Sequence, residues 1–335
     1  MKKIAVLGAG SWGATIAILL AAKNYQIILW DKIENHLKEI AQYRENKRYL
    51  PNIKLPDNIE IEFNLISAIK QAEYLVIAIP TQFIRSVFEN ISKELIKNKV
   101  IINLSKGIEL QKLKRISEIF TELFSCEILN QYCVLTGPSH SEEVSQKLPT
   151  SVIVASLNKQ QALICQEIFN TDYFRVYTSD DLIGAEIGGA VKNVIAIAAG
   201  ICDGLKLGDN ARAALITRGL AEITRFGAAF GAKPQTFAGL SGLGDLIVTC
   251  GSIHSRNYRC GKYLGEGEQI QNIKLKIGQI IEGLSTVESV CSLAKTKNIE
   301  MPICEQVLKV IKNEMTPKQS VSALMTRLTK QEFHL

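Results

Sequence analysis

One lysine of this chain stands where a charge is costly. Lys192 lies in the run from Gly188 to Asn210, which is apolar on both sides of it and reads as a buried helix. A buried ammonium raises the free energy of the folded state unless another group pairs with it, and the glycines of the run weaken the helix further. Two interpretations stay open: Lys192 transfers protons, or its side chain reaches solvent from a core helix. The run by itself favours the second.

A second lysine follows a strand. Lys106 lies in Ser105–Gly107, directly after the apolar run Val100–Asn103, and the motif Gly137–Ser139 follows the run Tyr132–Leu135 in the same way. Open α/β sheets bind ligands at the carboxyl ends of their strands. Either motif alone could be only a turn. Two of them at one edge predict a site there.

Residues suited to a phosphate stand in the last third of the chain. The glycine-rich stretch Gly239–Asp245 ends in an acid, and Ser255, Arg256 and Asn257 follow soon after it. Arginine offers a planar fork of donors, and serine and asparagine add neutral donors at a predicted helix start. A capped surface helix is the alternative interpretation.

The first thirty residues predict a dinucleotide site. Gly8-x-Gly10-x-x-Gly13 follows the apolar run Lys3–Leu7 and opens a helix at Ala14–Ala22. In that context Gly8 permits a tight turn, Gly10 lets a pyrophosphate approach the backbone, and Gly13 lets the helix pack on the strand. The phosphates would lie at the helix N-terminus.

The residues that close the second predicted strand give conflicting signals on the cofactor. Asp31 stands 18 residues after Gly13, where an acid would accept hydrogen bonds from a ribose 2′-hydroxyl and repel a 2′-phosphate. Lys32 beside it could pair with that phosphate, and Asp31 could instead cap the next helix. NAD and NADP therefore both stay open, with a slight preference for NAD.

Two folding patterns divide the chain. Strands alternate with helices up to about Ser179, which predicts an N-terminal, Rossmann-like, doubly wound and mostly parallel sheet. The expected strands are Lys3–Leu7, Gln26–Trp30, Ile59–Phe63, Tyr74–Ile79, Val100–Asn103, Tyr132–Leu135, Ser151–Ala155 and Phe174–Tyr177. Helical periodicity follows, at Leu182–Gly200, Ala211–Phe230, Pro234–Gly239, Ser255–Leu264, Ser285–Lys297, Ile303–Lys312 and Pro317–Leu328. We expect a dinucleotide-binding domain at residues 1–178 and an all-α substrate-binding and catalytic domain at 179–335.

Composition narrows the classes of partner. The net charge of +6 suits an anionic small molecule, and the scattered basic residues form no stripe that would indicate nucleic acid. The eight cysteines form no C-x-x-C pair and the four histidines are scattered, so we expect reduced thiols, no metal site and a cytoplasmic protein. No run of 18 apolar residues predicts an integral membrane segment. We expect a homo-oligomer, a dimer, although no residue pattern gives the oligomeric state.

Taken together, the motifs resemble those of the NAD(P)-dependent glycerol-3-phosphate dehydrogenases, most closely the bacterial branch. The longest match is the 22-residue stretch Gly189–Asn210 around Lys192. The others run in the family's order over nearly the whole chain: Gly8–Gly13, Ser105–Gly107, Gly137–His140, Ser241–Leu246 and His254–Asn257.

The resemblance implies a reaction and residue roles. The reaction would be reduction of dihydroxyacetone phosphate to glycerol 3-phosphate for phospholipid synthesis. Lys192 would exchange a proton with the substrate's C2 oxygen, while Lys106 and Asp245 would position and polarise the substrate. Substrate contacts would come from Lys106, Gly137, Ser139, Lys192, Asp245, Ser255, Arg256 and Asn257. The dinucleotide would be lined by Gly8, Gly10, Ser11, Trp12, Gly13, Asp31, Lys32, Tyr49, Lys106, Ser141, Arg256, Ile280 and Glu282.

One departure and two alternatives remain. Many relatives place histidine or arginine pairs near position 32 to meet a 2′-phosphate, whereas this chain has Lys32-Ile33 after Asp31. A β-hydroxyacid or 6-phosphogluconate-type dehydrogenase would share the two domains and the lysine. A dinucleotide-sensing protein without catalysis would need no proton donor, which the lysine and Asp245 argue against.

Overall fold

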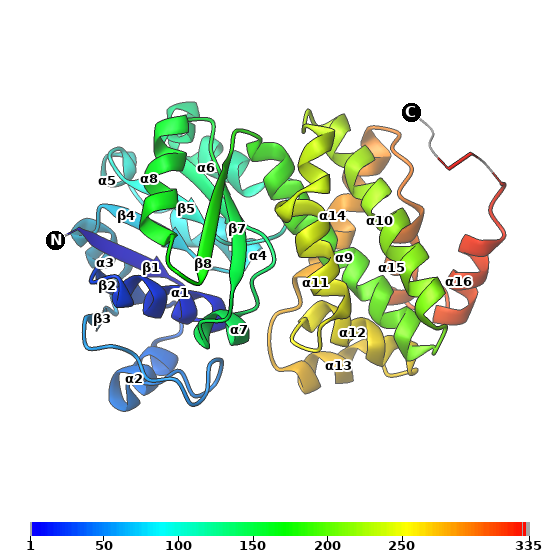
Figure 1. The fold of residues 1–335 in the computed structure, drawn as a ribbon, viewed down its shortest axis with the longest axis horizontal. Coiled ribbons are helices and arrows are strands. Elements are labelled where there is room, and N and C mark those ends of the chain that lie inside the picture. The colour runs from blue at the N-terminus through cyan, green and yellow to red at the C-terminus, as the bar shows by residue number, and fades with distance from the viewer. Residues whose placement is uncertain (1, 330, 333–335) are drawn as a thin grey trace.

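The N-terminal half is built around one eight-stranded sheet (Figure 1). The structure is a computed structural model and describes residues 2–329 and 331–332. The strand order is β3-β2-β1-β4-β5-β6-β7-β8, and only the β6–β7 pair is antiparallel. The strands are β1 (Lys3–Leu7), β2 (Gln26–Trp30), β3 (Ile59–Ile61), β4 (Tyr74–Ile77), β5 (Val100–Asn103), β6 (Tyr132–Thr136), β7 (Thr150–Ala155) and β8 (Phe174–Ser179). The predicted Rossmann-like, mostly parallel sheet is therefore confirmed.

Helices cover both faces of this sheet. Two separate apolar clusters, one with Leu20, Leu37 and Phe169 and the other with Phe88 and Phe120, lie on its opposite sides. The central strands are almost entirely apolar because both of their faces are buried, whereas the edge strands β3 and β8 carry exposed polar residues such as Glu60 and Arg175. The helices are α1 (Ser11–Ala22), α2 (Glu34–Tyr43), α3 (Leu65–Gln71), α4 (Thr81–Phe88), α5 (Lys93–Ile96), α6 (Ile116–Phe124), α7 (Ser141–Ser145) and α8 (Lys159–Phe169).

The parallel register brings the predicted motifs to one edge. Leu7 pairs with Trp30 and with Ile77, Ile77 pairs with Asn103, and Asn103 pairs with Val134. The carboxyl ends of these strands therefore lie side by side. This edge carries the glycine turn, Asp31 and the segments that contain Lys106 and Gly137.

The C-terminal half is helical. Among the described residues no strand follows β8. The α-helices are α9 (Leu182–Gly204), α10 (Asp209–Ala229), α11 (Asp245–Gly251), α12 (Arg256–Gly265), α13 (Ile270–Ile277), α14 (Glu282–Thr296), α15 (Pro302–Ile311) and α16 (Pro317–Met325). The predicted helix at Pro234–Gly239 is a 3₁₀ turn at Pro234–Ala238, and neither α11 nor α13 was predicted. The division at residue 178 stays a prediction; the last strand ends at Ser179 and α9 begins at Leu182.

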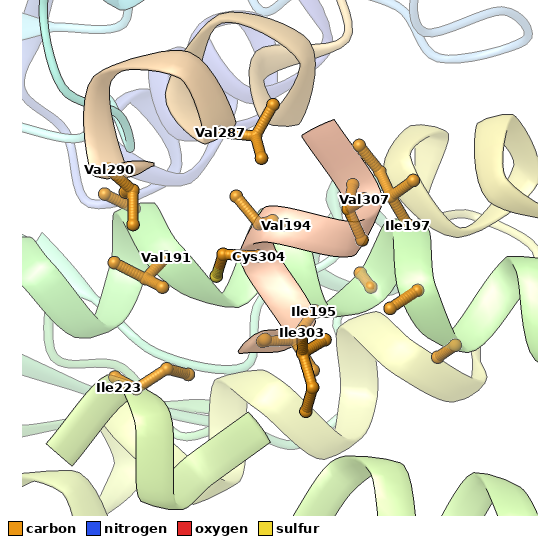
Figure 2. Packing of buried hydrophobic residues seen from close by; sticks show 14 of the residues in the cluster. Val191, Val194, Ile195, Ile197, Ile223, Val287, Val290, Ile303, Cys304 and Val307 are labelled. Atoms are coloured by element: carbon orange, nitrogen blue, oxygen red, sulfur yellow. The ribbon is translucent and has the colours of Figure 1, made fainter. Parts of the chain in front are cut away.

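Helix α9 is the centre of the helical half. Val191 and Val194 of α9 lie beside Val287 and Val290 of α14, and Cys304 of α15 packs against the same core (Figure 2). By length and composition α9 is long and apolar enough to cross a membrane, yet 94% of its most apolar window is buried inside the protein. That burial identifies it as a core helix.

Glycines let α12 lie directly against α9. A Cβ placed on Gly261 would stand 1.9 Å from the carbonyl oxygen of Ile197, and one on Gly200 would stand 2.0 Å from the carbonyl oxygen of Tyr258. No side chain fits at such distances. The glycines of the Lys192 region therefore serve close backbone packing, which offsets their weak helix propensity.

Candidate active site

Lys192 is buried and paired. Its side chain is 7% exposed, and its ammonium donates a short hydrogen bond to Oδ1 of Asp245. A second donation goes to Oγ1 of Thr249 at 2.7 Å. Asp245 begins α11, and Thr249 lies one turn later on the same face. The solvent-reaching interpretation of Lys192 is therefore wrong, because the ammonium is turned toward α11 and paired there.

Lys106 joins the sheet to this pair. Its ammonium, on the segment after β5, donates to Oδ2 of Asp245 at 2.7 Å and to the carbonyl oxygen of Gly137 at 3.1 Å. One aspartate carboxylate thus holds two ammonium groups, one from each half of the chain. The cluster of Lys106, Lys192 and Asp245 carries a net positive charge where the sheet edge meets the helical half.

Burial and charge tune the pKa values of this cluster. Burial, with a smaller contribution from the charge of Lys106, lowers the pKa of Lys192 to about 8, and Asp245 opposes part of this shift. Burial alone would raise the pKa of Asp245, but the ammonium groups of Lys106 and Lys192 hold it below its usual range. At neutral pH the cluster therefore contains an ionised carboxylate and a lysine that can give up its proton near physiological pH.

A wide turn precedes Asp245. Residues Leu240–Gly244 form one π-helical turn, a form found often at functional sites. Gly188 of α9 approaches this turn so closely that an added Cβ would lie 2.5 Å from the carbonyl oxygen of Ser241. The close approach places α9, and with it Lys192, against the start of α11.

The three residues predicted for a phosphate lie together at the start of α12. Ser255 caps the helix by accepting from the N–H of Tyr258 at 3.2 Å. Arg256 donates to the carbonyl oxygen of Ile280 at 2.9 Å. Asn257 is buried and uses its amide within the protein, donating to Asn193 at 3.0 Å and accepting from the N–H of Gly283 at 2.9 Å.

Asn193 connects this segment to Lys106. Its side-chain amide donates to the backbone carbonyl oxygen of Lys106 at 3.3 Å and accepts from Asn257. Neither Asn193 nor Thr249 was predicted as a site residue. Their sequence signals are weak. Asn193 is only a polar residue next to Lys192, and Thr249 is only a polar residue four positions after Asp245. The structure brings them in through helix geometry.

The glycine turn has the shape that a dinucleotide needs. A Cβ on Gly8 would lie 2.5 Å from the carbonyl oxygen of Ala78, and one on Gly13 would lie 1.8 Å from that of Gly8. At Gly10 the same test finds nothing within 4 Å. No side chain caps α1, so its first N–H groups remain open to an anion. Ser11 and Trp12 are the first two residues of that helix.

The other predicted cofactor residues border the same region. The ring of Tyr49 packs edge-on against that of His36, with ring centroids 5.0 Å apart. The carbonyl oxygen of Ser141 accepts a hydrogen bond from the hydroxyl of Thr15 in α1 at 3.4 Å. Lys32 is exposed just after β2. The hydroxyl of Ser139 donates to the carbonyl oxygen of Gly137 at 2.9 Å.

Glu282 has an unused acceptor at the junction of the two halves. Its Oε1 accepts from the N–H of Thr81 at 3.0 Å, whereas its Oε2 is buried without a partner, as is Oγ1 of Thr81. Both unpartnered atoms lie against Gly107, next to Lys106. Burial raises the pKa of Glu282 to about 7, although the N–H of Thr81 and the charge of Arg256 lower it in part. Buried polar atoms without partners fit a site that accepts a polar ligand.

Side chains of the types that bind metal ions are spread over the part of the chain that the structure describes. No three histidine, cysteine or acidic side chains gather there to hold an ion. His140 and His254 lie near each other, with ring centroids 5.8 Å apart. Residue 334, the fourth histidine, lies outside the described residues.

Known proteins match the chain along almost its whole length. A model of the N-terminus of NAD-dependent glycerol-3-phosphate dehydrogenase matches residues 3–162, and a model of the C-terminus matches residues 181–322. The NAD(P)+ glycerol-3-phosphate dehydrogenase of Lysinibacillus sphaericus (strain C3-41) is 47% identical over 333 residues, which cover 99% of this chain and 98% of the relative. This chain belongs to the NAD-dependent glycerol-3-phosphate dehydrogenase family.

Further relatives agree with the family assignment. The NAD(P)+ glycerol-3-phosphate dehydrogenase of Geobacillus thermodenitrificans (strain NG80-2) is 48% identical over 335 residues, covering 100% of this chain and 97% of the relative. The crystal structure of glycerol-3-phosphate dehydrogenase from Coxiella burnetii is 40% identical with a TM-score of 0.93, covering 97% of this chain and 99% of that one. The family, enzyme class and NAD(P) cofactor predicted from the motifs are therefore confirmed, and the individual residue roles stay predictions.

Proposed function

We propose that this chain reduces dihydroxyacetone phosphate to sn-glycerol 3-phosphate with NADH or NADPH, reversibly. The cluster of Lys106, Lys192 and Asp245 carries the proposal. It lies at the sheet edge that also bears the glycine turn, so a proton donor and a dinucleotide site would lie at the same edge of the sheet. A protein that only senses a dinucleotide would need no buried, paired lysine there.

Each lysine of the cluster keeps one N–H for a substrate. An ammonium has three donors. Lys192 uses two of them on Asp245 and Thr249, and Lys106 uses two on Asp245 and the carbonyl of Gly137. The remaining donor of each can meet the ketone oxygen. Asp245 fixes both ammonium groups, because each of its carboxylate oxygens binds one of them.

The chemistry divides between the cofactor and these side chains. When bound, the dinucleotide supplies the hydride that reduces C2 of the ketone. Lys192 donates a proton to the C2 oxygen as negative charge develops there, and its lowered pKa favours that transfer. Lys106 stabilises the same charge with its ammonium. In the oxidation direction a neutral Lys192 removes the proton.

The start of α12 supports a role in holding the substrate's phosphate. Arg256 uses one donor on the carbonyl of Ile280, and its guanidinium has others to offer. Ser255 accepts from a backbone N–H and keeps its own O–H for donation. Asn257 and Asn193 link this segment to Lys106, so a phosphate bound there would be at a fixed place relative to the reacting centre.

A single assay separates the candidate functions. Purified protein is given NADH or NADPH with dihydroxyacetone phosphate, and in parallel NAD or NADP with β-hydroxy acids and 6-phosphogluconate. We expect NADH or NADPH to be oxidised with dihydroxyacetone phosphate, and NAD or NADP not to be reduced with the hydroxy acids or 6-phosphogluconate. Turnover of hydroxy acids alone would favour the other dehydrogenase class, and cofactor binding without any turnover would favour a sensor.

The wider role follows from the reaction by analogy. We expect the enzyme to act in the cytoplasm as a homodimer and to supply glycerol 3-phosphate for phospholipid synthesis. The division into a cofactor domain (1–178) and a substrate-binding domain (179–335) belongs to the same proposal. Sedimentation of the purified protein tests the homodimer. Growth of a deletion strain with or without added glycerol 3-phosphate tests the supply of this metabolite.

A further inference from the structure

The carboxylate of Asp31 is attached to the glycine turn. Its Oδ2 accepts from the backbone N–H of Ala9 at 2.7 Å, and its Oδ1 accepts from the N–H of Ile33 at 2.9 Å. Ala9 is the residue between Gly8 and Gly10. The negative charge that ends β2 is therefore fixed beside the turn proposed to hold the pyrophosphate, where the adenosine ribose of a bound dinucleotide lies in this type of fold.

The peptide group that Asp31 contacts is itself held firmly. The carbonyl oxygen of Ala9 accepts from Nδ2 of Asn46 at 2.7 Å and from Nε2 of His36 at 3.1 Å. Both of these side chains are buried. If Asp31 rotated away to make room for a 2′-phosphate, the N–H of the fully buried Ala9 would lose its partner, which is unfavourable.

Asp31 also removes a donor that a 2′-phosphate would need. The backbone N–H of Ile33 points at the carboxylate and is satisfied by it. Ile33 itself presents an apolar side chain that is 51% exposed. The position after Lys32 therefore offers a phosphate neither a free N–H nor a charge.

Several basic side chains of the segments that follow Asp31 contact other groups. Arg44 donates to backbone carbonyls of the segment before β3, including that of Ile59 at 2.9 Å. Lys47 lies over the ring of Tyr43, and Arg48 lies over the ring of Tyr49. Lys38 pairs with Glu34. Lys32 is exposed, so its flexible charge is screened by solvent, whereas the charge of Asp31 is fixed at the turn.

We infer that Asp31 makes this enzyme select NAD(H) over NADP(H). The inference rests on the proposed function of the same site. The carboxylate accepts hydrogen bonds from the ribose 2′-hydroxyl and repels a 2′-phosphate in its place. Lys32, which the sequence left as an opposing signal, has only a secondary influence.

The test measures binding first, so that it does not depend on turnover. Calorimetric titration of the wild-type protein with NAD and with NADP gives a ratio of dissociation constants. We expect NAD to bind at least about tenfold more tightly, because a 2′-phosphate of nearly two negative charges held about 4 Å from the carboxylate in water is repelled by about 1 kcal/mol per charge. The ratio of kcat/KM for NADH and NADPH with dihydroxyacetone phosphate should follow it.

Two variants and a control locate the effect. Asp31→Ser and Asp31→Asn should each lower the preference for NAD by about tenfold, chiefly through tighter NADP binding. Glu34→Gln removes an exposed acid nearby that does not contact the turn, and should leave the ratio unchanged. Thermal unfolding of each variant verifies that it is folded.

The outcomes are separate for the two claims. Equal or tighter NADP binding by the wild-type protein would overturn the inference, whether or not the variants fold. A folded Asp31→Ser protein with an unchanged ratio would also overturn it. If neither cofactor were oxidised with dihydroxyacetone phosphate, the proposed function would fail, while the calorimetric ratio would still decide the role of Asp31.

Discussion

The protonation state of Lys192 decides which direction of the reaction the site can assist. Burial lowers the pKa of this lysine to about 8, with Lys106 adding to the shift. Below that pH the ammonium is present and can donate; above it the amine is present and can accept. The paired carboxylate of Asp245 remains ionised over this range, because the two ammonium groups lower its pKa.

The pH dependence of the two directions should therefore be opposite. We expect kcat/KM for reduction of dihydroxyacetone phosphate to fall as the pH rises through about 8, and kcat/KM for oxidation of glycerol 3-phosphate to rise over the same interval. Initial rates from pH 6.5 to 9.5, with cofactor dissociation constants measured alongside, provide the check. Parallel profiles in both directions would contradict a proton-transfer role for this lysine.

Residue types and spacing were enough to find the charged members of the site. Lys192 was found as a charge in an apolar run, Lys106 by its place after a strand, and Asp245 as the acid that ends a glycine-rich stretch. Thr249 and Asn193 could not be found in the same way. A threonine and an asparagine inside helices are ordinary, and their roles depend on which face of α11 and α9 turns toward the cluster.

At the scale of elements, two glycines of the glycine turn have different roles, one in the stability of the fold and the other in cofactor binding. Gly13 has no room for a side chain, since a Cβ would lie 1.8 Å from the carbonyl oxygen of Gly8, whereas Gly10 has open space around it. The backbone at Gly10 has a φ of −66°, which any residue adopts. The open space at Gly10 is the room that the pyrophosphate would occupy.

Alanine at these two glycines should have different effects. We expect Gly10→Ala to leave the melting temperature nearly unchanged but to weaken cofactor binding by about tenfold or more, because the methyl group enters the ligand's space. Gly13→Ala should destabilise the fold by about 1–3 kcal/mol through overpacking. Thermal unfolding and calorimetry on both variants make the comparison. A Gly10→Ala protein that binds NAD normally would contradict the placement of the pyrophosphate.

Strands and helices were predicted correctly where the pattern of apolar residues was clear. All eight strands were predicted, because each is a short run rich in apolar or β-branched residues that ends at polar or turn residues. The direction of β7 and β8 relative to β6 was not predicted, because a strand has the same residue pattern whether it runs parallel or antiparallel to its neighbour. Helix α13 was missed because its sequence, Ile270–Ile277, is rich in lysine and short.

At the scale of the whole molecule, a buried ion pair joins the two halves behind the site. Arg115, before α6, donates to Glu186 of α9 at 2.7 Å, and the side chains are 15% and 4% exposed. The same carboxylate accepts from the N–H of Ser117 at 2.8 Å and from the hydroxyl of Tyr132 at 3.1 Å. This cluster helps to fix the distance between the sheet edge and α9.

Loss of the Glu186 charge should destabilise the molecule and disturb the site. We expect Glu186→Gln to lower the free energy of unfolding by about 3–5 kcal/mol, because the charge of Arg115 then has only the more exposed carboxylate of Glu118 as an ionic partner. Glu268→Gln is the matched control: it breaks an exposed pair with Lys276 and should cost about 1 kcal/mol or less. Equal effects in denaturant titrations would show that the buried pair does not hold the halves together.

The two-half architecture was predictable from the change of periodicity near residue 179. How the halves meet was not, because contacts such as Lys106 to Asp245 join residues 139 positions apart. The sequence shows that each half carries part of a site; only the fold shows that one carboxylate receives an ammonium from each.

Lys192 gives the most direct test of the account. Lys192→Met keeps an apolar side chain of similar length and removes the ammonium. We expect kcat for dihydroxyacetone phosphate reduction to fall by about 10²–10⁴-fold, the usual contribution of a positioned proton donor, while the dissociation constant for NAD stays within about twofold of wild type, less than half a kcal/mol. A folded variant that kept more than about a tenth of the wild-type kcat would contradict the central claim.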